Sequence, residues 1–216
     1  MNEDPQAQGK PKGGILTWAL WGVALVGVAA VLYIIAQAST KTAPTQASAP
    51  APASAGKAAG TSFASKLTTP AQPTLPPDYA FYDETGKAMK VADLKGKVVV
   101  MNIWATWCAP CKIEMPTLAK LAKAYEGKPV EVVAVSIDSV DAADQARLFI
   151  AQNAPLKFYH DREMKLPFKL VPAAPGAPTT VVYGRDGLEV GRVAGEADWS
   201  GPEARALVEK ALAAGG

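Results

Sequence analysis

The sequence has few of the residues that build disulfide-stapled or metal-bound folds: 216 residues include two cysteines and one histidine. Two cysteines are too few for a disulfide framework, which in secreted domains takes several bridges. The single histidine, His160, leaves little from which to build a closed zinc site, since such a site takes four ligands. Cys108 and Cys111 are spaced as Cys-x-x-Cys, and this spacing indicates either redox chemistry or part of a metal site.

A strong excess of one charge is also absent, because 22 Lys and Arg residues stand against 20 Asp and Glu residues. No stretch interleaves basic and aromatic residues in the way that tracks a nucleic-acid backbone. We therefore expect no nucleic-acid partner and no partner chosen mainly by charge.

Charged residues are missing altogether from Ile15 to Ala36. As a helix this run would span about 33 Å, enough for a hydrocarbon core of about 30 Å. Residues 15–38 are therefore predicted to be a transmembrane anchor, with residues 1–14 as a cytoplasmic tail. The alternative is a signal peptide cleaved after Ala38, but cleaved signals usually have an apolar region of about 7–15 residues.

Residues 39–77 are mostly Ala, Pro, Ser, Thr and Gly. Such a composition buries too little apolar surface to offset the entropy of ordering, so it predicts a flexible linker. Globular patterns begin at residue 78, and residues 78–216 are predicted to form one folded domain.

The apolar pattern of this domain predicts a β-β, β-α-β-α, β-β-α order with a parallel middle part. The result is an α/β fold with a mixed central sheet, flanking helices and an N-terminal β-hairpin. The expected elements are a hairpin at 79–91, a buried strand at 98–104, a helix after the cysteines, a strand at 130–137, a helix at 141–153, a short strand at 158–160, a hairpin at 179–193 and a helix at 202–213.

The two cysteines lie where the buried strand ends and the next helix begins. A thiolate is the nucleophile in disulfide exchange, and the free N–H groups and dipole of a helix N-terminus stabilise its charge. Cys108 comes first and is expected to be the exposed attacking residue. Cys111, one turn further into the helix, is expected to attack the mixed disulfide and release the product. Pro110 suits the first helical turn, where no N–H is needed.

The stretch from Gly96 to Pro116, with Trp104-Ala105-Thr106-Trp107-Cys108-Ala109-Pro110-Cys111 at its centre, resembles the TlpA/ResA/CcmG group of membrane-tethered proteins. The likeness is greatest to the TlpA-like thiol:disulfide interchange proteins. It implies a thioredoxin-like fold and a protein-disulfide reductase that needs no cofactor beyond its redox-active disulfide. It also implies a single-pass protein of the bacterial inner membrane whose catalytic domain faces the periplasm.

The resemblance further implies partners. The clients would be oxidised proteins with cysteine pairs, in cytochrome c maturation or in copper delivery to cytochrome oxidase. Electrons would come from a separate membrane protein of the DsbD/CcdA type.

Two positions near the cysteines carry over from the family. Asn102 stands where ordinary thioredoxin has a buried aspartate, so proton handling at Cys111 needs another group. Glu114 matches the helix glutamate of the family and lies three residues after Cys111, on the same helix face. It is the candidate for this role, although it could equally be an ordinary exposed acid of the helix.

Three further residues are predicted to contact the client. Pro178 matches the family's cis-proline, which would present the backbone of Ala177 to an extended client segment. The alternative is an edge-strand proline that ends strand pairing. Trp107 would cover the attacking sulfur and offer an apolar surface.

Three other functions are conceivable for the same two cysteines. A Cu(I) metallochaperone could use the same two thiolates, since soft sulfur suits that ion. An oxidase is less favoured, because strong oxidants of this fold tend to have a histidine between the cysteines. A peroxidase is not expected, because no Pro-x-x-x-Thr/Ser-x-x-Cys pattern precedes either cysteine.

Overall fold

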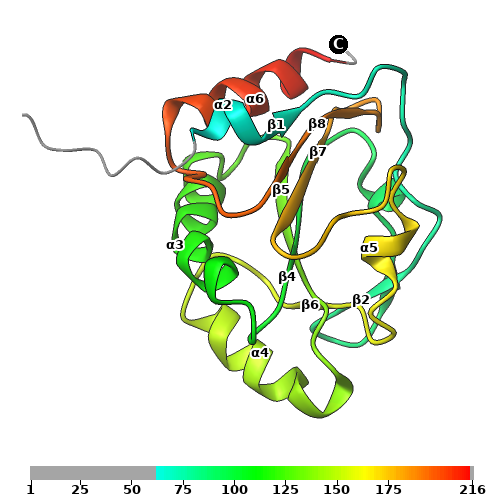
Figure 1. Cartoon of the computed structure of the whole chain (residues 1–216), viewed down its shortest axis with the longest axis vertical. Helices are drawn as coiled ribbons and strands as arrows, with labels where there is room; N and C mark the ends of the chain where they lie inside the picture. The colour runs from blue at the N-terminus through cyan, green and yellow to red at the C-terminus, as the bar shows by residue number, and fades with distance from the viewer. Residues whose placement is uncertain (1–61, 215–216) are drawn as a thin grey trace, which may run out of the picture. The chain divides into compact units, whose positions relative to one another are not determined.

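The computed structural model describes residues 62–214. Within them, eight strands form one mixed sheet in the order β1-β8-β7-β4-β5-β6-β2-β3 (Figure 1). The strands are β1 (Leu67–Thr68), β2 (Phe81–Asp83), β3 (Ala88–Met89), β4 (Val98–Trp104), β5 (Val130–Ser136), β6 (Tyr159–His160), β7 (Thr179–Tyr183) and β8 (Glu189–Ala194). The helices are α2 (Phe63–Lys66), α3 (Ala109–Ala124), α4 (Ala143–Ala151), α5 (Leu166–Lys169) and α6 (Pro202–Ala213), with 3-10 turns η1 (Val91–Leu94) and η2 (Val140–Ala142).

Strand β4 lies at the centre of the sheet, and all seven of its residues are buried. It runs parallel to β5 and antiparallel to β7, so both of its edges are paired. Burial on both faces explains why its sequence is a nearly continuous apolar run rather than an alternating one. The strand ends at Trp104, and α3 begins five residues later.

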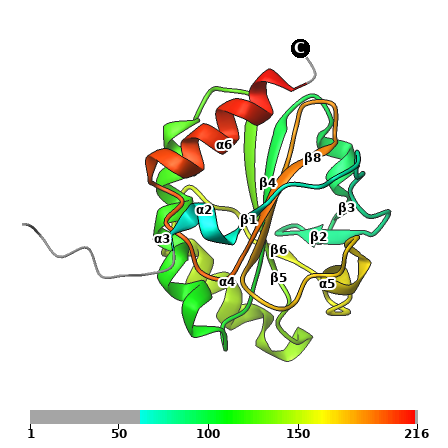
Figure 2. The same cartoon turned by 45° about the horizontal axis from the view of Figure 1, so that its top comes forward.

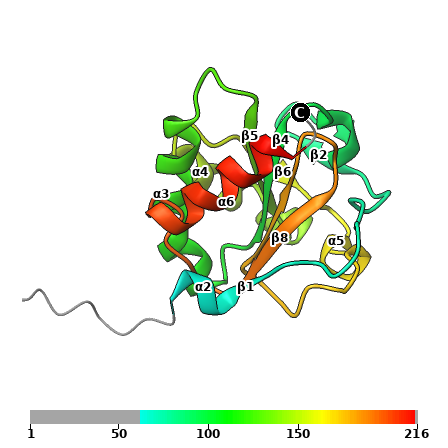
Figure 3. The ribbon, with the colours of Figure 1, turned by 90° about the horizontal axis from the view of Figure 1, so that it is seen from above.

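Helices cover both sides of this sheet. Helices α3 and α6 lie on one side and the short helix α5 on the other, as the view from above shows (Figure 3). Helix α4 packs through Phe149, whose ring centroid is 5.4 Å from that of Trp104. Trp104 is fully buried, as expected for a core residue.

The predicted linker is wrong for residues 63–68. Helix α2 and strand β1 lie along the domain beside α6 and β8 (Figure 2). The physical reason is Phe63, an isolated aromatic that is 7% exposed and packs edge-on against Trp199 at 5.2 Å. The large apolar ring and the pairing of β1 with β8 together hold this segment on the domain.

Most predicted elements are confirmed, with shifts of one or two residues at their ends. Helix α6 and strands β4 and β7 have the predicted bounds. The N-terminal hairpin is shorter than predicted because Val91 turns inward at the start of η1, where it is 3% exposed. Helix α5 was not predicted, since four residues containing a proline give no helical periodicity.

Among residues 62–214, none of the helices combines the length and the apolar character that a membrane span requires. The predicted tail (1–14), anchor (15–38) and most of the linker lie outside the described residues, so they stay predictions.

Candidate functional site

Cys108 and Cys111 form a disulfide bond at the junction between β4 and α3. Residues 105–107 connect the strand to the helix, and Cys108 is the residue that caps the helix. A buried strand followed at once by a 16-residue helix thus places both sulfur atoms at a helix N-terminus. This is the position that the sequence predicted.

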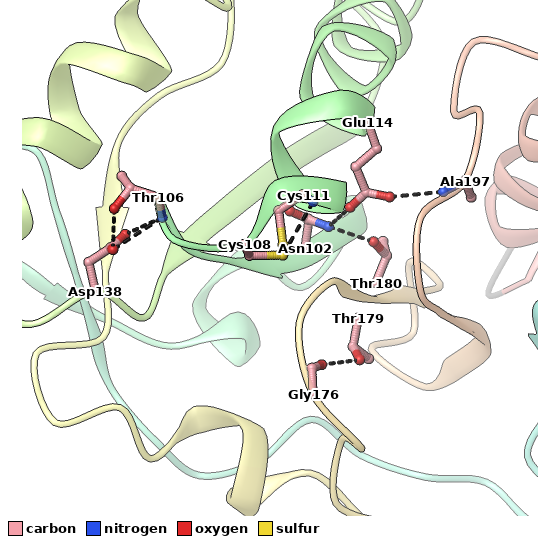
Figure 4. The surroundings of a disulfide bond; sticks show 10 residues. All are labelled: Asn102, Thr106, Cys108, Cys111, Glu114, Asp138, Gly176, Thr179, Thr180 and Ala197. Atoms are coloured by element: carbon pink, nitrogen blue, oxygen red, sulfur yellow. Dashed lines mark hydrogen bonds between the residues drawn. A yellow bond between two sulfur atoms is a disulfide. The ribbon is translucent and has the colours of Figure 1, made fainter. Parts of the chain in front are cut away.

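The two sulfur atoms differ in their surroundings. The backbone N–H of Cys111 donates to Cys108 Sγ at 3.2 Å, so the first turn of α3 points a donor at the sulfur predicted to attack (Figure 4). Such a donor stabilises a thiolate. Cys108 is 4% exposed and Cys111 is 0% exposed. Cys108 is therefore the more accessible sulfur, but it is far less open than expected.

Glu114 is buried rather than exposed. Its side chain comes from the second turn of α3 and is 1% exposed. Oε1 accepts a hydrogen bond from Asn102 Nδ2 at 2.8 Å, and Oε2 accepts one from the backbone N–H of Ala197 at 3.1 Å (Figure 4). The alternative of an ordinary surface acid is therefore wrong.

Burial raises the pKa of the Glu114 carboxyl to about 7 from its ordinary 4.5. The hydrogen bonds from Asn102 and Ala197 act in the opposite direction but do not cancel the loss of hydration. A carboxyl with a pKa near 7 is present in both protonation states at neutral pH, and so it can accept or donate a proton.

Asn102 has the chemistry to serve both states of Glu114. Its Nδ2 donates to Glu114 Oε1 and to Thr180 Oγ1, each at 2.8 Å, whereas its Oδ1 is buried without a hydrogen-bond partner. An ionised carboxylate needs the donor side of the amide, and a protonated carboxyl can use the acceptor side after the amide turns over. An ionised aspartate at this position could not donate to a carboxylate.

A second buried carboxylate, Asp138, lies on the other side of the disulfide (Figure 4). Its oxygens accept from the backbone N–H of Thr106 at 3.0 and 3.1 Å, from Thr106 Oγ1 at 2.6 Å and from Ser136 Oγ at 2.8 Å. These bonds fix residue 106, two positions before Cys108. Asp138 is thus a positioning residue for the loop that presents the attacking sulfur.

Sequence reasoning missed Asp138, although a signal was present. It follows β5, and β5 runs parallel to β4, so the ends of both strands meet at one edge of the sheet. A carboxylate just after the second strand therefore belongs beside the cysteines, which follow the first.

The residues predicted to contact the client are placed as follows. The Ala177–Pro178 peptide bond is cis, Pro178 is buried and Ala177 is half-buried. Trp107 is 66% exposed and so offers apolar surface beside Cys108. His160 is buried, and its Nε2 lies 2.9 Å from the carbonyl oxygen of Asp138. His160 is therefore a core residue next to the site.

The sequence and the fold are similar to those of known proteins. The model of the AhpC/TSA family matches residues 74–188, which is just over half of the chain. The chain belongs to the AhpC/TSA family. Within it, the relatives and neighbours described next support the TlpA/ResA/CcmG group that the sequence resembles.

Curated relatives include the thiol-disulfide oxidoreductase ResA of Bacillus thuringiensis subsp. konkukian, 32% identical over 123 residues. ResA of Bacillus anthracis is 36% identical over 124 residues. Each match covers 56% of this chain and 68% of the relative. Among solved structures, a Chlorobium tepidum protein assigned as thiol:disulfide interchange protein DsbE has a TM-score of 0.57 at 27% identity. That match covers 65% of this chain and 97% of the other. The family member described here is a thiol-disulfide oxidoreductase with a thioredoxin-like fold.

Proposed function

We propose that this oxidoreductase reduces disulfide bonds of client proteins on the periplasmic side of the bacterial inner membrane, where residues 15–38 anchor it. The arrangement of the two cysteines carries the proposal. Cys108 caps α3 beside the exposed ring of Trp107, and Cys111 is buried one turn further along the helix. An attacking and a resolving thiol need this order of accessibility. Alanine and proline between the cysteines, in place of a histidine, favour the reducing direction.

The reaction begins when the Cys108 thiolate attacks one sulfur of the client disulfide. A mixed disulfide forms, and the client's other sulfur leaves as a thiolate and takes a proton from solvent. Cys111 then loses its proton, and its thiolate attacks Cys108 Sγ. This second exchange forms the Cys108–Cys111 bond and releases the remaining client thiolate. Two electrons pass from the protein dithiol to the client disulfide.

Glu114 is the acceptor for the proton that Cys111 loses. It lies on the same face of α3 as Cys111, its pKa of about 7 leaves a large fraction ionised, and its burial excludes solvent as the competing base. Asn102 can bond to Glu114 before and after this proton transfer. Its amide N–H donates to the carboxylate, and its carbonyl oxygen can accept from the protonated carboxyl.

The proposed client class and electron source rest on the resemblance of the sequence to the TlpA/ResA/CcmG group. The clients are oxidised cysteine pairs of proteins in cytochrome c maturation or in copper delivery to cytochrome oxidase. A membrane protein of the DsbD/CcdA type supplies two electrons to reduce the Cys108–Cys111 bond again.

The proposal is tested by trapping with Cys111→Ser in the full chain. Without the resolving thiol, the mixed disulfide at Cys108 should persist and client adducts should accumulate until dithiothreitol releases them. The matched control is the double variant Cys108→Ser/Cys111→Ser, which should give no adducts. Failure of Cys111→Ser to give any Cys108-dependent adduct contradicts the reductase function.

The direction of electron flow is tested by the reduction potential. A value near about −270 mV, as in thioredoxin, fits a reductant, whereas a value near about −120 mV fits an oxidant.

The alternative function is that of a Cu(I) metallochaperone. Within residues 62–214 no group of three or more His, Cys, Asp or Glu side chains is arranged to hold a metal ion, so copper would have to bind through the two thiolates. Stoichiometric Cu(I) retained by the reduced protein against a chelator would favour that alternative.

A further inference from the structure

The segment from Val171 to Pro178 contains Ala177, whose backbone is predicted to meet the client, and ends at the cis-proline Pro178. It contains three prolines and forms neither helix nor strand. Proline has no N–H, so the segment has few backbone donors with which to fix its own shape. The residues near its start, Val171 and Pro172, are exposed, whereas Pro178 at its end is buried.

The second half of this segment is held by its neighbours. The backbone N–H of Ala174 donates to Pro167 O at 2.9 Å, Thr179 Oγ1 donates to Gly176 O at 2.6 Å (Figure 4), and the Gly195 N–H donates to Pro178 O at 2.8 Å.

The first half is held by a side chain, that of Arg192 in β8. Its NH1 donates to Pro172 O at 2.6 Å, and its NH2 donates to Val171 O at 3.1 Å. The planar guanidinium presents several donors in a fixed geometry, so one residue can hold two successive carbonyls together. Arg192 is 8% exposed, and a charge buried to that extent needs a partner.

That partner is Glu189, which accepts from Arg192 Nε at 2.7 Å and from NH2 at 2.6 Å. Residues three apart in a regular strand point to opposite faces of the sheet. Here the pairing of β7 with β8 is irregular: Val182 faces Gly191 and Tyr183 faces Glu189, which leaves Val190 as one extra residue. Because of this bulge, Glu189 and Arg192 lie on the same face of the sheet. On that face the guanidinium also reaches the carbonyl oxygens of Val171 and Pro172.

We propose that the Glu189–Arg192 pair is a positioning device for client binding: it holds residues 171–172 so that Ala177 meets an extended client segment in a fixed geometry. This proposal rests on the proposed function, because only a peptide client pairs with the backbone of residue 177. It adds specificity-determining residues about 80 positions away from the cysteines in the sequence.

The test compares two probes on the pre-reduced full chain. One probe is a synthetic peptide of about ten residues closed by a single disulfide, and the other is bis(2-hydroxyethyl) disulfide, which has no peptide groups. Oxidation of the protein thiols is followed by quenching and alkylation at increasing probe concentrations. The maximal rate and the half-saturating concentration are measured for each probe.

The principal variant is Glu189→Met/Arg192→Met. Removing both charges leaves no unpaired buried ion, so the fold is retained while the two bonds to the segment are lost. We expect the ratio of maximal rate to half-saturating concentration to fall about tenfold for the peptide, mainly through a higher half-saturating concentration. For the small disulfide it should stay within about twofold.

Two further variants keep the result interpretable. Arg192→Lys retains the charge beside Glu189 but cannot hold both carbonyls, so it should have an intermediate effect on the peptide alone. Arg185 lies in the turn between β7 and β8 and donates to the backbone carbonyl of Gly96. Arg185→Met is the matched control, and it should leave the rates with both probes unchanged.

An equal loss with both probes, or no loss with the peptide, overturns the proposal and leaves the proposed function intact. A wild-type protein that is oxidised by neither probe overturns the proposed function itself, before any variant is compared.

Discussion

Two buried carboxylates flank the disulfide (Figure 4). Their hydrogen-bond partners suit them to different roles, because one fixes the loop before Cys108 and the other can exchange a proton. Asp138 accepts from two hydroxyl groups and one backbone N–H, which together fix the loop before Cys108. Glu114 accepts from the Asn102 amide and from the backbone N–H of Ala197, and burial raises its pKa to about 7. The two acids thus differ in what they hold: Asp138 fixes the backbone of the loop before Cys108, whereas Glu114 lies on the helix face of Cys111 with a pKa that suits proton exchange.

The largest effect is expected from Asp138→Ala. This change leaves the Thr106 N–H and two hydroxyl groups without their acceptor, so the free energy of unfolding should fall by about 3 kcal/mol. Denaturant unfolding at neutral pH measures it. The matched control is Asp144→Ala, at an exposed position of α4, where we expect a change within about 0.5 kcal/mol. A loss at Asp138 no larger than the control would remove the anchoring half of the comparison.

The second effect concerns Glu114 and pH. Because the folded pKa is raised above its ordinary 4.5 to about 7, the protonated form is favoured by folding. The contribution of the protonated carboxyl to stability is complete below about pH 4.5, and it is lost as the pH rises through about 7. At about 1.4 kcal/mol per unit, the wild type should lose up to about 3 kcal/mol over this range relative to Glu114→Gln.

Unfolding midpoints of the wild type and Glu114→Gln, measured in parallel from about pH 4 to pH 8, give this difference directly. A difference that is constant with pH would mean that the Glu114 carboxyl has nearly the same pKa in the folded and the unfolded chain, and its role in proton transfer would lose its support.

The smallest effect sharpens the comparison at Asn102. Asn102→Leu removes the hydrogen bond that most lowers the pKa of Glu114, so that pKa should rise by about one unit. The pH profile of mixed-disulfide resolution should move upward by the same amount. Thr106→Val is the control, because its hydroxyl bonds to Asp138 rather than to Glu114. An equal movement with both variants would show that the profile reports general loosening of the site.

The sequence predicted the central strand, the helix after it and the two cysteines at their junction, because each depends on a local pattern. An unbroken apolar run with a Cys-x-x-Cys behind it has few alternative structures. The burial of Glu114 could not be predicted in the same way. It depends on residues 197–199, which lie more than 80 positions away and fold over the second turn of α3.

The same limit applies to Phe63 and to Arg192. Phe63 was assigned to the linker by the composition around it, and only the Trp199 ring reveals why it folds onto the domain. Arg192 and Glu189 are separated by a spacing that a regular strand would place on opposite faces. Their pairing depends on a bulge, and no local pattern predicted it.

The ends of the sheet bear on how such a protein handles its clients. In the part of the chain that the structure describes, residues 62–214, the outermost strands β1 and β3 are each two residues long. Partly unfolded clients carry unpaired backbone groups, and a long free edge would offer them a template for growing a mixed sheet. Edges this short give an incoming chain little to pair with, so the domain offers a weak template for aggregation.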